Sequence, residues 1–326
     1  VFFKPVGRTL PPTRWVRRVV DAVGTCRFVR HAPPELRKGV DWNRFFLGRC
    51  FERGVFDHLT VPTREAESDV LATVEGADAA DGPFANPVED RVSVVPGPTE
   101  RWESDLSREA ARRELDLPVE GTQLLYFGRL CEENGVHALF EALETYDGPA
   151  FTMVFAGQPV AVSEAELREV AIKSDAAVVS RLEFVPQSDL ETYFRAADGV
   201  VLPYEPSFGA QRPSNVFQKA CMAGRPVIAS DFGVLGRRVR EWNLGLRCEP
   251  GSPASIADTI AEFVARDGDV YDPESMAAFA ETQTFERLGE IVDGIYRRLV
   301  PDGSTTGGDP DPDPDPDVET GDSRDG

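Results

Sequence analysis

The chain has 326 residues, 41% of them hydrophobic, so it has enough apolar side chains for buried cores and enough length for two domains. Its formal net charge of −21 repels nucleic acid and anionic membrane surfaces, which argues against either as a broad partner. No apolar run approaches the ~20 residues that a membrane helix needs, and the start shows no signal peptide. We therefore expect a cytoplasmic protein, with at most peripheral contact with the inner face of the membrane.

Two features of the composition indicate the cellular environment in which the protein works. The chain has only four lysines, Lys4, Lys38, Lys173 and Lys219, and its other strongly basic residues are arginines. An acidic, lysine-poor surface indicates a salt-rich, halophilic cytoplasm, although a GC-rich genome combined with one acidic tail would give the same composition. The five cysteines are widely spaced and contain no C-x-x-C pair, which favours reduced thiols over a disulfide framework or a zinc site.

Residues 1–117 show an irregular α/β pattern. The expected elements, in chain order, are a helix near 12–23, a strand near 25–30, a helix near 42–53, a strand at 57–61, a helix from Thr63, a loop at 75–90 and a strand at 91–95. These elements make up about half of an α/β domain. The segment 96–98 (PGP) and a charged helix at 107–115 follow, and we interpret them as the connection to the next domain.

Residues 118–299 alternate short apolar strands with amphipathic helices. Strands are expected at 123–127, 151–155, 181–185, 199–202, 226–229 and 245–248. One helix is expected to begin with the capping box Ser188…Glu191, another to begin after Ser252, and a last one has an apolar stripe over 285–299. Such alternation predicts a parallel, doubly wound sheet with helices on both faces, in which ligands bind at the carboxyl ends of the strands.

The segment 300–326 is predicted to be a disordered acidic tail. It alternates aspartate and proline over 309–317 and has no side chains that could form a core. Because a proline separates each aspartate from the next, the carboxylates have no fixed coordination shell, and we expect no metal site there.

The segment 213–230 (PSNVFQKACMAGRPVIAS) is the strongest local signal in the chain. Pro213 and Ser214 begin a helix, Gly224 ends it, and a strand follows. The free amides at the start of the helix then face the carboxyl end of the sheet, where they form a site for an anion. An ordinary capped helix without a ligand would have the same local sequence.

A set of motifs in one order points to a family. The motifs are 125–130 (LYFGRL), 155–157 (FAG), 182–190 (LEFVPQSDL), and 213–230 followed by Gly245 and Leu246. Together they resemble the donor domain of the family-four retaining glycosyltransferases, which have the GT-B architecture of two Rossmann-like domains. The resemblance covers 91–299 and extends more weakly over 25–70, where 30–35 (RHAPPE) resembles the histidine loop of the acceptor domain. It implies a short or truncated acceptor-side domain at 1–117 and a nucleotide-sugar-binding domain at 118–299.

The resemblance also implies roles for single residues. Arg129 would hold the donor diphosphate, since a guanidinium binds phosphate oxygens in pairs. His31 would face the transferred sugar, although a histidine held within its own loop fits the sequence equally well. We take Arg129 and His31 as the catalytic candidates. The other substrate-binding positions that match family motifs are Gly128, Val185, Pro186, Ser214, Asn215 and Val216.

The chemistry that the resemblance implies needs no cofactor and no metal. A nucleotide-sugar of UDP or GDP type is the donor, and a glycan or a lipid-linked molecule is the acceptor of a hexosyl group. The anomeric configuration is retained. A diphosphate leaving group gains negative charge as the glycosidic bond breaks, and an arginine together with a helix N-terminus can stabilise that charge.

Three positions depart from the family pattern. Asn134 stands where the family has a lysine, and Gln211 and Lys219 stand where it has paired glutamates. Gln211, Arg212 or Lys219 would have to substitute for the missing groups. We expect Lys219 to reach toward the start of its helix and contact the donor, while a solvated helix face explains a lysine there equally well. Two interpretations follow: an active glycosyltransferase, or a non-catalytic GT-B relic that binds a glycan or a partner.

Overall fold

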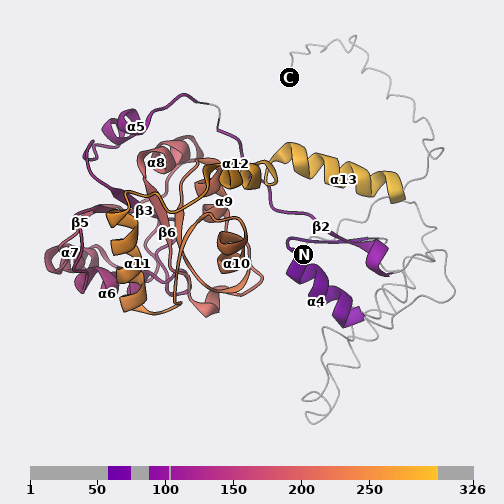
Figure 1. The fold of residues 1–326 in the computed structure, drawn as a ribbon, viewed down its shortest axis with the longest axis horizontal. Coiled ribbons are helices and arrows are strands. Elements are labelled where there is room, and N and C mark those ends of the chain that lie inside the picture. The colour runs from indigo at the N-terminus through magenta and orange to yellow at the C-terminus, as the bar shows by residue number, and fades with distance from the viewer. Residues whose placement is uncertain (1–57, 75–87, 103, 300–326) are drawn as a thin grey trace, which may run out of the picture.

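The computed structural model describes residues 58–74, 88–102 and 104–299 (Figure 1). The predictions that fall outside these residues are the helices near 12–23 and 42–53, the strand near 25–30, His31, the acidic tail and most of the loop at 75–90. The described residues form a large α/β unit and a small unit, which two segments of the chain connect.

The large unit is built on six parallel strands in the order β5-β4-β3-β6-β7-β8. The strands are β3 (Gln123–Phe127), β4 (Thr152–Ala156), β5 (Ala177–Arg181), β6 (Gly199–Leu202), β7 (Val227–Ser230) and β8 (Gly245–Cys248). The chain runs outward from β3 to β5, returns to β6 beside β3, and then continues in the other direction. The order of the strands therefore reverses between β3 and β6, and ligands bind at the carboxyl ends of strands that flank such a point.

Helices cover both faces of the large sheet (Figure 1). One face packs against α6 (Val136–Glu144), α7 (Glu164–Lys173) and α11 (Pro253–Ala265). The other packs against α5 (Arg108–Glu114), α8 (Leu190–Ala196), α9 (Asn215–Met222), α10 (Gly233–Glu241) and α12 (Pro273–Glu281). Strand side chains alternate between the two cores: Leu125 belongs to the α8 side, and Leu124 and Tyr126 belong to the α6 side.

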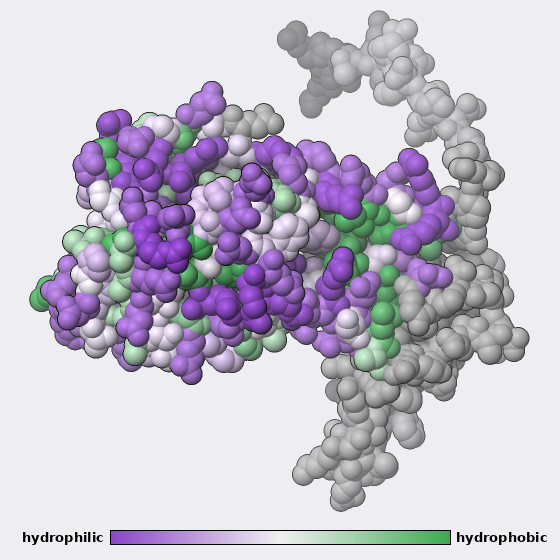
Figure 2. Space-filling model, viewed as in Figure 1, coloured by the Kyte–Doolittle hydropathy of each residue, from purple (hydrophilic) through white to green (hydrophobic). Residues whose placement is uncertain are grey.

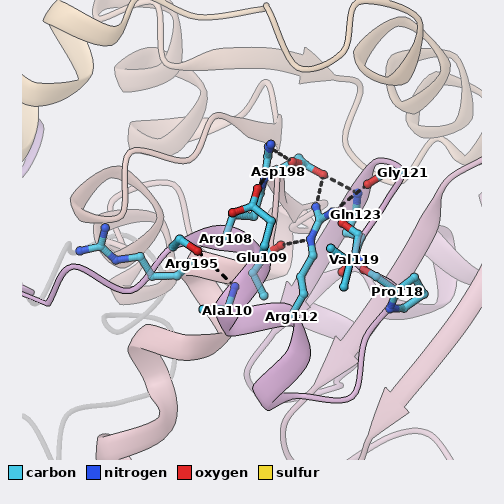
Figure 3. Close-up of polar contacts among 12 residues, drawn as sticks. Arg108, Glu109, Ala110, Arg112, Pro118, Val119, Gly121, Gln123, Arg195 and Asp198 are labelled. Atoms are coloured by element: carbon cyan, nitrogen blue, oxygen red, sulfur yellow. Dashed lines mark hydrogen bonds and ion pairs between the residues drawn. The ribbon is translucent and has the colours of Figure 1, made fainter.

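A buried arginine fastens α5 to the amino ends of β3 and β6 (Figure 3). Arg112 is only 3% exposed, and its Nη2 lies 2.6 Å from Oδ2 of Asp198. Its remaining donors reach the backbone carbonyl oxygens of Ala196, Val119 and Gly121. A guanidinium can stay buried here because each nitrogen has an acceptor.

The small unit consists of β1 (Leu59–Val61), β2 (Val92–Val94) and α4 (Arg64–Val74). The two strands pair in parallel, and α4 packs on them over a core that contains Val61 and Val92. The last helix, α13 (Phe285–Leu299), leaves the large unit and reaches the small one, where Nη2 of Arg298 donates to Oγ of Ser93 at 3.4 Å (Figure 1).

The two segments that cross between the units are hydrogen-bonded to each other. The backbone amide of Thr99, in the connection, donates to the carbonyl oxygen of Gln283, just before α13, at 2.7 Å. Gln218 of α9 contacts both segments, because its Nε2 lies 2.9 Å from the Gly97 carbonyl and 3.0 Å from Oε1 of Gln283. Thr99, Gln218 and Gln283 are all buried. The crossings are therefore joined at one point beside α9.

Two predicted elements are wrong. The strand predicted at 181–185 lies at 177–181, because these residues pair with β4 and the chain leaves the sheet after Arg181. The capping box Ser188…Glu191 does not form: the Ser188 hydroxyl donates to its neighbour Asp189, and a 3-10 turn precedes α8. The α/β class, the parallel sheet and the helix at 285–299 are confirmed.

The visible surface of the described units is largely hydrophilic. Figure 2 shows that hydrophilic residues dominate the visible face of the described units. None of the helices in the described part of the chain has the length and apolar character that a bilayer crossing requires.

Candidate functional site

The reversal of strand order brings two loops together. The loop after β3 begins with Gly128, which has a φ of +111°, and its amide donates to the Ala156 carbonyl at 2.9 Å. The loop after β6 leads into α9. The two loops meet where a Cβ added to Gly128 would lie 3.7 Å from Cγ2 of Val216. The backbone that follows β3 therefore runs directly past the start of α9.

Arg129 follows Gly128 on a rigid backbone. Nδ2 of Asn134 donates to the Arg129 carbonyl at 2.9 Å, and the hydroxyl of Tyr126 donates to the same oxygen at 3.2 Å. The side chain of Arg129 is exposed and makes no ion pair with any described residue. The loop thus fixes the backbone of Arg129 and leaves its guanidinium available to an anion. The amide of Asn134, the position of the family lysine, is used to fix this loop.

The start of α9 offers free amides beside that arginine. Ser214 is buried and caps the helix, since its Oγ accepts from the Phe217 amide at 3.1 Å. Tyr204 forms a 2.9 Å hydrogen bond with the same Oγ, and burial raises the pKa of Tyr204 to about 12, so it stays neutral. The amides of Asn215 and Val216 have no acceptor among the described residues. Such amides bind anions at a helix N-terminus.

Arg212 connects the two loops. Its guanidinium lies 4.4 Å from the ring centroid of Phe208, and its Nη1 lies 3.2 Å from Oε1 of Glu133. Phe208 in turn stacks on Tyr204, with 4.3 Å between the ring centroids. Arg212 therefore forms an ion pair with Glu133, a residue of the loop after β3.

Contacts from α4 reach the same end of the sheet. Nε2 of Gln211 donates to Oδ2 of Asp69 at 3.0 Å, and Nη1 of Arg237 lies 2.6 Å from Oε1 of Glu65. Sequence reasoning missed both acidic residues. The available signal was their spacing of four residues, which places Glu65 and Asp69 on one face of the helix.

Lys219 and two further substrate-binding candidates, Val185 and Pro186, lie beside the connection. Nζ of Lys219 is 5.8 Å from the ring centroid of Trp102, and burial lowers the pKa of Lys219, while the nearby Glu100 carboxylate acts to raise it. Val185 is buried and Pro186 is exposed in the loop after β5. The amine of Lys219 is thus directed at the connection, so its contact with a donor stays a prediction.

The structure brings most of the predicted site residues together. Those at the carboxyl ends of β3 and β6 are Gly128, Arg129, Asn134, Gln211, Arg212, Ser214, Asn215 and Val216. Val185, Pro186 and Lys219 lie nearer the connection, and His31 lies outside the described residues. In the described part of the chain no group of three or more His, Cys, Asp or Glu side chains is placed to hold a metal ion.

Comparison with known proteins identifies the large unit. Residues 121–266 match the family model described as Glycosyl transferases group 1. The chain carries a Glycosyl transferases group 1 domain. This family domain contains β3 to β8 and every one of the candidate residues at the ends of β3 and β6. The resemblance seen in the sequence motifs is therefore confirmed.

Relatives with curated names agree with this family. The chain is 32% identical over 273 residues to the D-inositol 3-phosphate glycosyltransferase of Acidothermus cellulolyticus, covering 79% of this chain and 57% of that protein. It is 29% identical over 219 residues to the D-inositol 3-phosphate glycosyltransferase of Corynebacterium efficiens, covering 65% of this chain and 49% of that protein. The chain thus spans about half the length of the curated relatives that it matches.

Solved structures show that the fold is GT-B-like. Sucrose-phosphate synthase from Thermosynechococcus elongatus superposes with a TM-score of 0.58 at 19% identity, over 85% of this chain and 65% of that one. Anabaena HepE in complex with UDP superposes with a TM-score of 0.60 at 15% identity, over 79% of this chain and 69% of that one. The predicted fold class is therefore confirmed.

Proposed function

We propose that this protein is a glycosyltransferase that transfers a hexosyl group from a nucleoside-diphosphate donor of UDP or GDP type to a glycan or lipid-linked acceptor. It retains the anomeric configuration and needs no metal. The observation that carries the proposal is the position of Arg129 beside the free amides of Asn215 and Val216, at the reversal of strand order. The family domain and the named relatives support it.

The charges at this site suit a diphosphate leaving group. Such a group becomes more negative as the bond to the sugar breaks, so positive groups held at that place lower the barrier. Arg129 presents a guanidinium that no described carboxylate neutralises, and the first turn of α9 presents free amides at the same edge of the sheet. Because the α9 amides and the backbone of Arg129 are fixed before the ligand arrives, little backbone reorganisation is needed when the charge develops.

Binding without metal is the first test. Calorimetry with UDP, GDP and ADP at high salt and in the presence of EDTA should show binding of at least one nucleotide. No heat from any of the three at millimolar concentration would rule out the proposed donor site. Adding Mg²⁺ in place of EDTA should leave the affinity of the nucleotide that binds unchanged, and a requirement for Mg²⁺ would overturn the metal-independent part of the proposal.

Turnover is the second test. The relatives are named D-inositol 3-phosphate glycosyltransferases, which makes D-inositol 3-phosphate the first acceptor to assay, followed by glycans and lipid-linked sugars. Release of the nucleoside diphosphate should depend on the acceptor, and the product should have the anomeric configuration of the donor sugar by NMR. An inverted product would contradict the retaining mechanism.

A non-catalytic binding protein is the second candidate function. The side-chain amides of Asn134 and Gln211 are engaged by Arg129 and Asp69 at positions where the family pattern has charged side chains. Loss of a hydrogen bond to a charged group costs about 1.5–3 kcal/mol, which could remove turnover and leave binding. Nucleotide binding without release of product, across the acceptors named above, would favour this candidate.

A further inference from the structure

Gln211 has a carbonyl oxygen that lacks a partner. Its Nε2 donates to Asp69, whereas its Oε1 is buried and has no hydrogen-bond donor among the described residues. A buried acceptor left without a donor is costly, so such an atom commonly marks a place that a ligand or a water fills. The donation to Asp69 also fixes which way the amide faces, because it assigns the nitrogen to the carboxylate side.

Asp69 is a carboxylate without a cation. It is exposed on α4, and in the described part of the chain its carboxylate contacts the Gln211 amide and forms no ion pair. Glu65, one helical turn earlier, differs because Arg237 neutralises it at 2.6 Å. Both carboxylates therefore contact the large unit, but only the charge of Glu65 is neutralised by a described cation.

The place of this pair relative to the proposed diphosphate site indicates what it would bind. Gln211 lies next to Arg212, which contacts the loop that follows Arg129, and three residues before the Ser214 cap of α9. A molecule whose phosphates lie on Arg129 and the α9 amides would extend from there toward α4 with the group attached to the phosphates. In a nucleotide-sugar the diphosphate carries the nucleoside at one end and the sugar at the other, and the sugar hydroxyls are donors that suit carboxylate and amide oxygens.

We propose that Asp69 and Gln211 together bind hydroxyls of the transferred sugar, with Asp69 supplying the carboxylate that the family pattern places at position 211. The inference rests on the proposed function, since it needs a sugar attached to the diphosphate. An aspartate joined to a glutamine carries the same net charge as a single glutamate, and it offers the orphaned Oε1 in addition. The sugar contact is then made from both units.

The test compares nucleotides with their sugar conjugates: UDP with UDP-glucose, GDP with GDP-mannose and ADP with ADP-glucose, all by calorimetry. Asp69→Asn should weaken binding of the conjugate by about 10–100-fold, the loss expected for a hydrogen bond to a charged group, and leave binding of the bare nucleotide unchanged. Gln211→Glu should also weaken binding of the sugar conjugate, because it places a second carboxylate beside that of Asp69. The double variant Asp69→Asn with Gln211→Glu exchanges the two groups and should recover most of the loss.

Glu65→Gln is the matched control, because it removes the charge that pairs α4 with Arg237 of the large unit without touching Gln211. It should leave both affinities unchanged. Three results would show that Asp69 does not bind the sugar, while the proposed function stands. Asp69→Asn could leave the affinity for the conjugate unchanged, lower the affinities for nucleotide and conjugate equally, or have the same effect as Glu65→Gln. If the unaltered protein binds no nucleotide, the proposed function fails and this inference fails with it. Recovery in the double variant, with nucleotide affinity constant throughout, establishes the shared site.

Discussion

Gly157 and Gly128 are in direct backbone contact: a Cβ added to Gly157 would lie 1.9 Å from the carbonyl oxygen of Gly128. Gly157 also has a φ of +136°, which side-chain-bearing residues rarely adopt. The contact explains why a glycine ends the motif at 155–157, because any side chain there would push the loop that holds Arg129 out of place.

Gly157→Ala should therefore lower stability by more than the ~1–3 kcal/mol that a strained backbone conformation alone costs. Gly128→Ala is the control, since Gly128 also has a positive φ but has room for a Cβ, which would lie 3.7 Å from Val216. Urea denaturation of both variants measures the difference. Equal losses of stability would show that the contact between the two loops is not tight.

Arg112→Ala should destabilise the protein by about 3–5 kcal/mol, because it removes a buried guanidinium that donates to three backbone carbonyl oxygens and to Asp198, which then keeps only the half-exposed Arg108 as a cationic partner among the described residues. The pair lies at the amino ends of β3 and β6, whereas the candidate site lies at the carboxyl ends. Nucleotide affinity, measured by calorimetry at a temperature where the variant is folded, should therefore stay unchanged. A loss of affinity without a loss of stability would contradict a purely structural role.

Arg129→Ala should weaken nucleotide binding by about 1.5–3 kcal/mol, the range for a hydrogen bond to a charged group. The melting temperature should barely change, because the side chain is exposed and forms no ion pair with a described residue. Arg168→Ala is a matched control, since Arg168 on α7 is 75% exposed and, among the described residues, pairs with Glu164 alone. A large drop in melting temperature with affinity intact would show that Arg129 is structural.

His58 should make stability depend on pH. Burial, together with the positive charges of Arg298 and Arg91, lowers the pKa of His58 from 6.5 to about 4. The unfolded chain then binds a proton between pH 6.5 and 4 that the folded chain does not, so stability falls as the pH drops through this window. His58→Gln cannot take up that proton. Urea denaturation at pH 7 and pH 4.5 should therefore show a smaller fall for the variant, and an equal fall would rule out the titration of His58.

The fold was largely predictable because its strands are short apolar runs between clear breaks. The strands at 123–127, 199–202 and 245–248 have the predicted bounds. The error at 181–185 arose because Phe184 and Val185 look like strand residues, yet Phe184 is 70% exposed in a loop. The position of β5 is set by its pairing with β4, in which Thr152 to Ala156 lie opposite Ala177 to Arg181. Local sequence does not show which residues of a neighbouring strand will be paired.

The candidate site was predictable only where its residues lie in sequence motifs at strand ends. Arg129 and the start of α9 lie within recognisable motifs at strand ends, so their meeting follows from the parallel sheet. The contact between Asp69 and Gln211 joins residues 142 positions apart, and no periodicity predicts it. The sequence also did not predict the direction of the Lys219 side chain. Its amine lies over the Trp102 ring, although the position of Lys219 on α9 would also allow it to reach the start of the helix.

The hydrogen bond between Thr99 and Gln283 has a mechanical consequence. The two segments that join the units are fastened together there and both are held by Gln218, so they act as one pivot instead of two separate tethers. Gln218 lies only two residues from Val216, on the helix whose first amides face the candidate diphosphate site. Any rotation of the small unit therefore turns about a point close to those amides and displaces them little. The same rotation would move α4 relative to the large unit, and would thereby change the distance between Asp69 and Gln211.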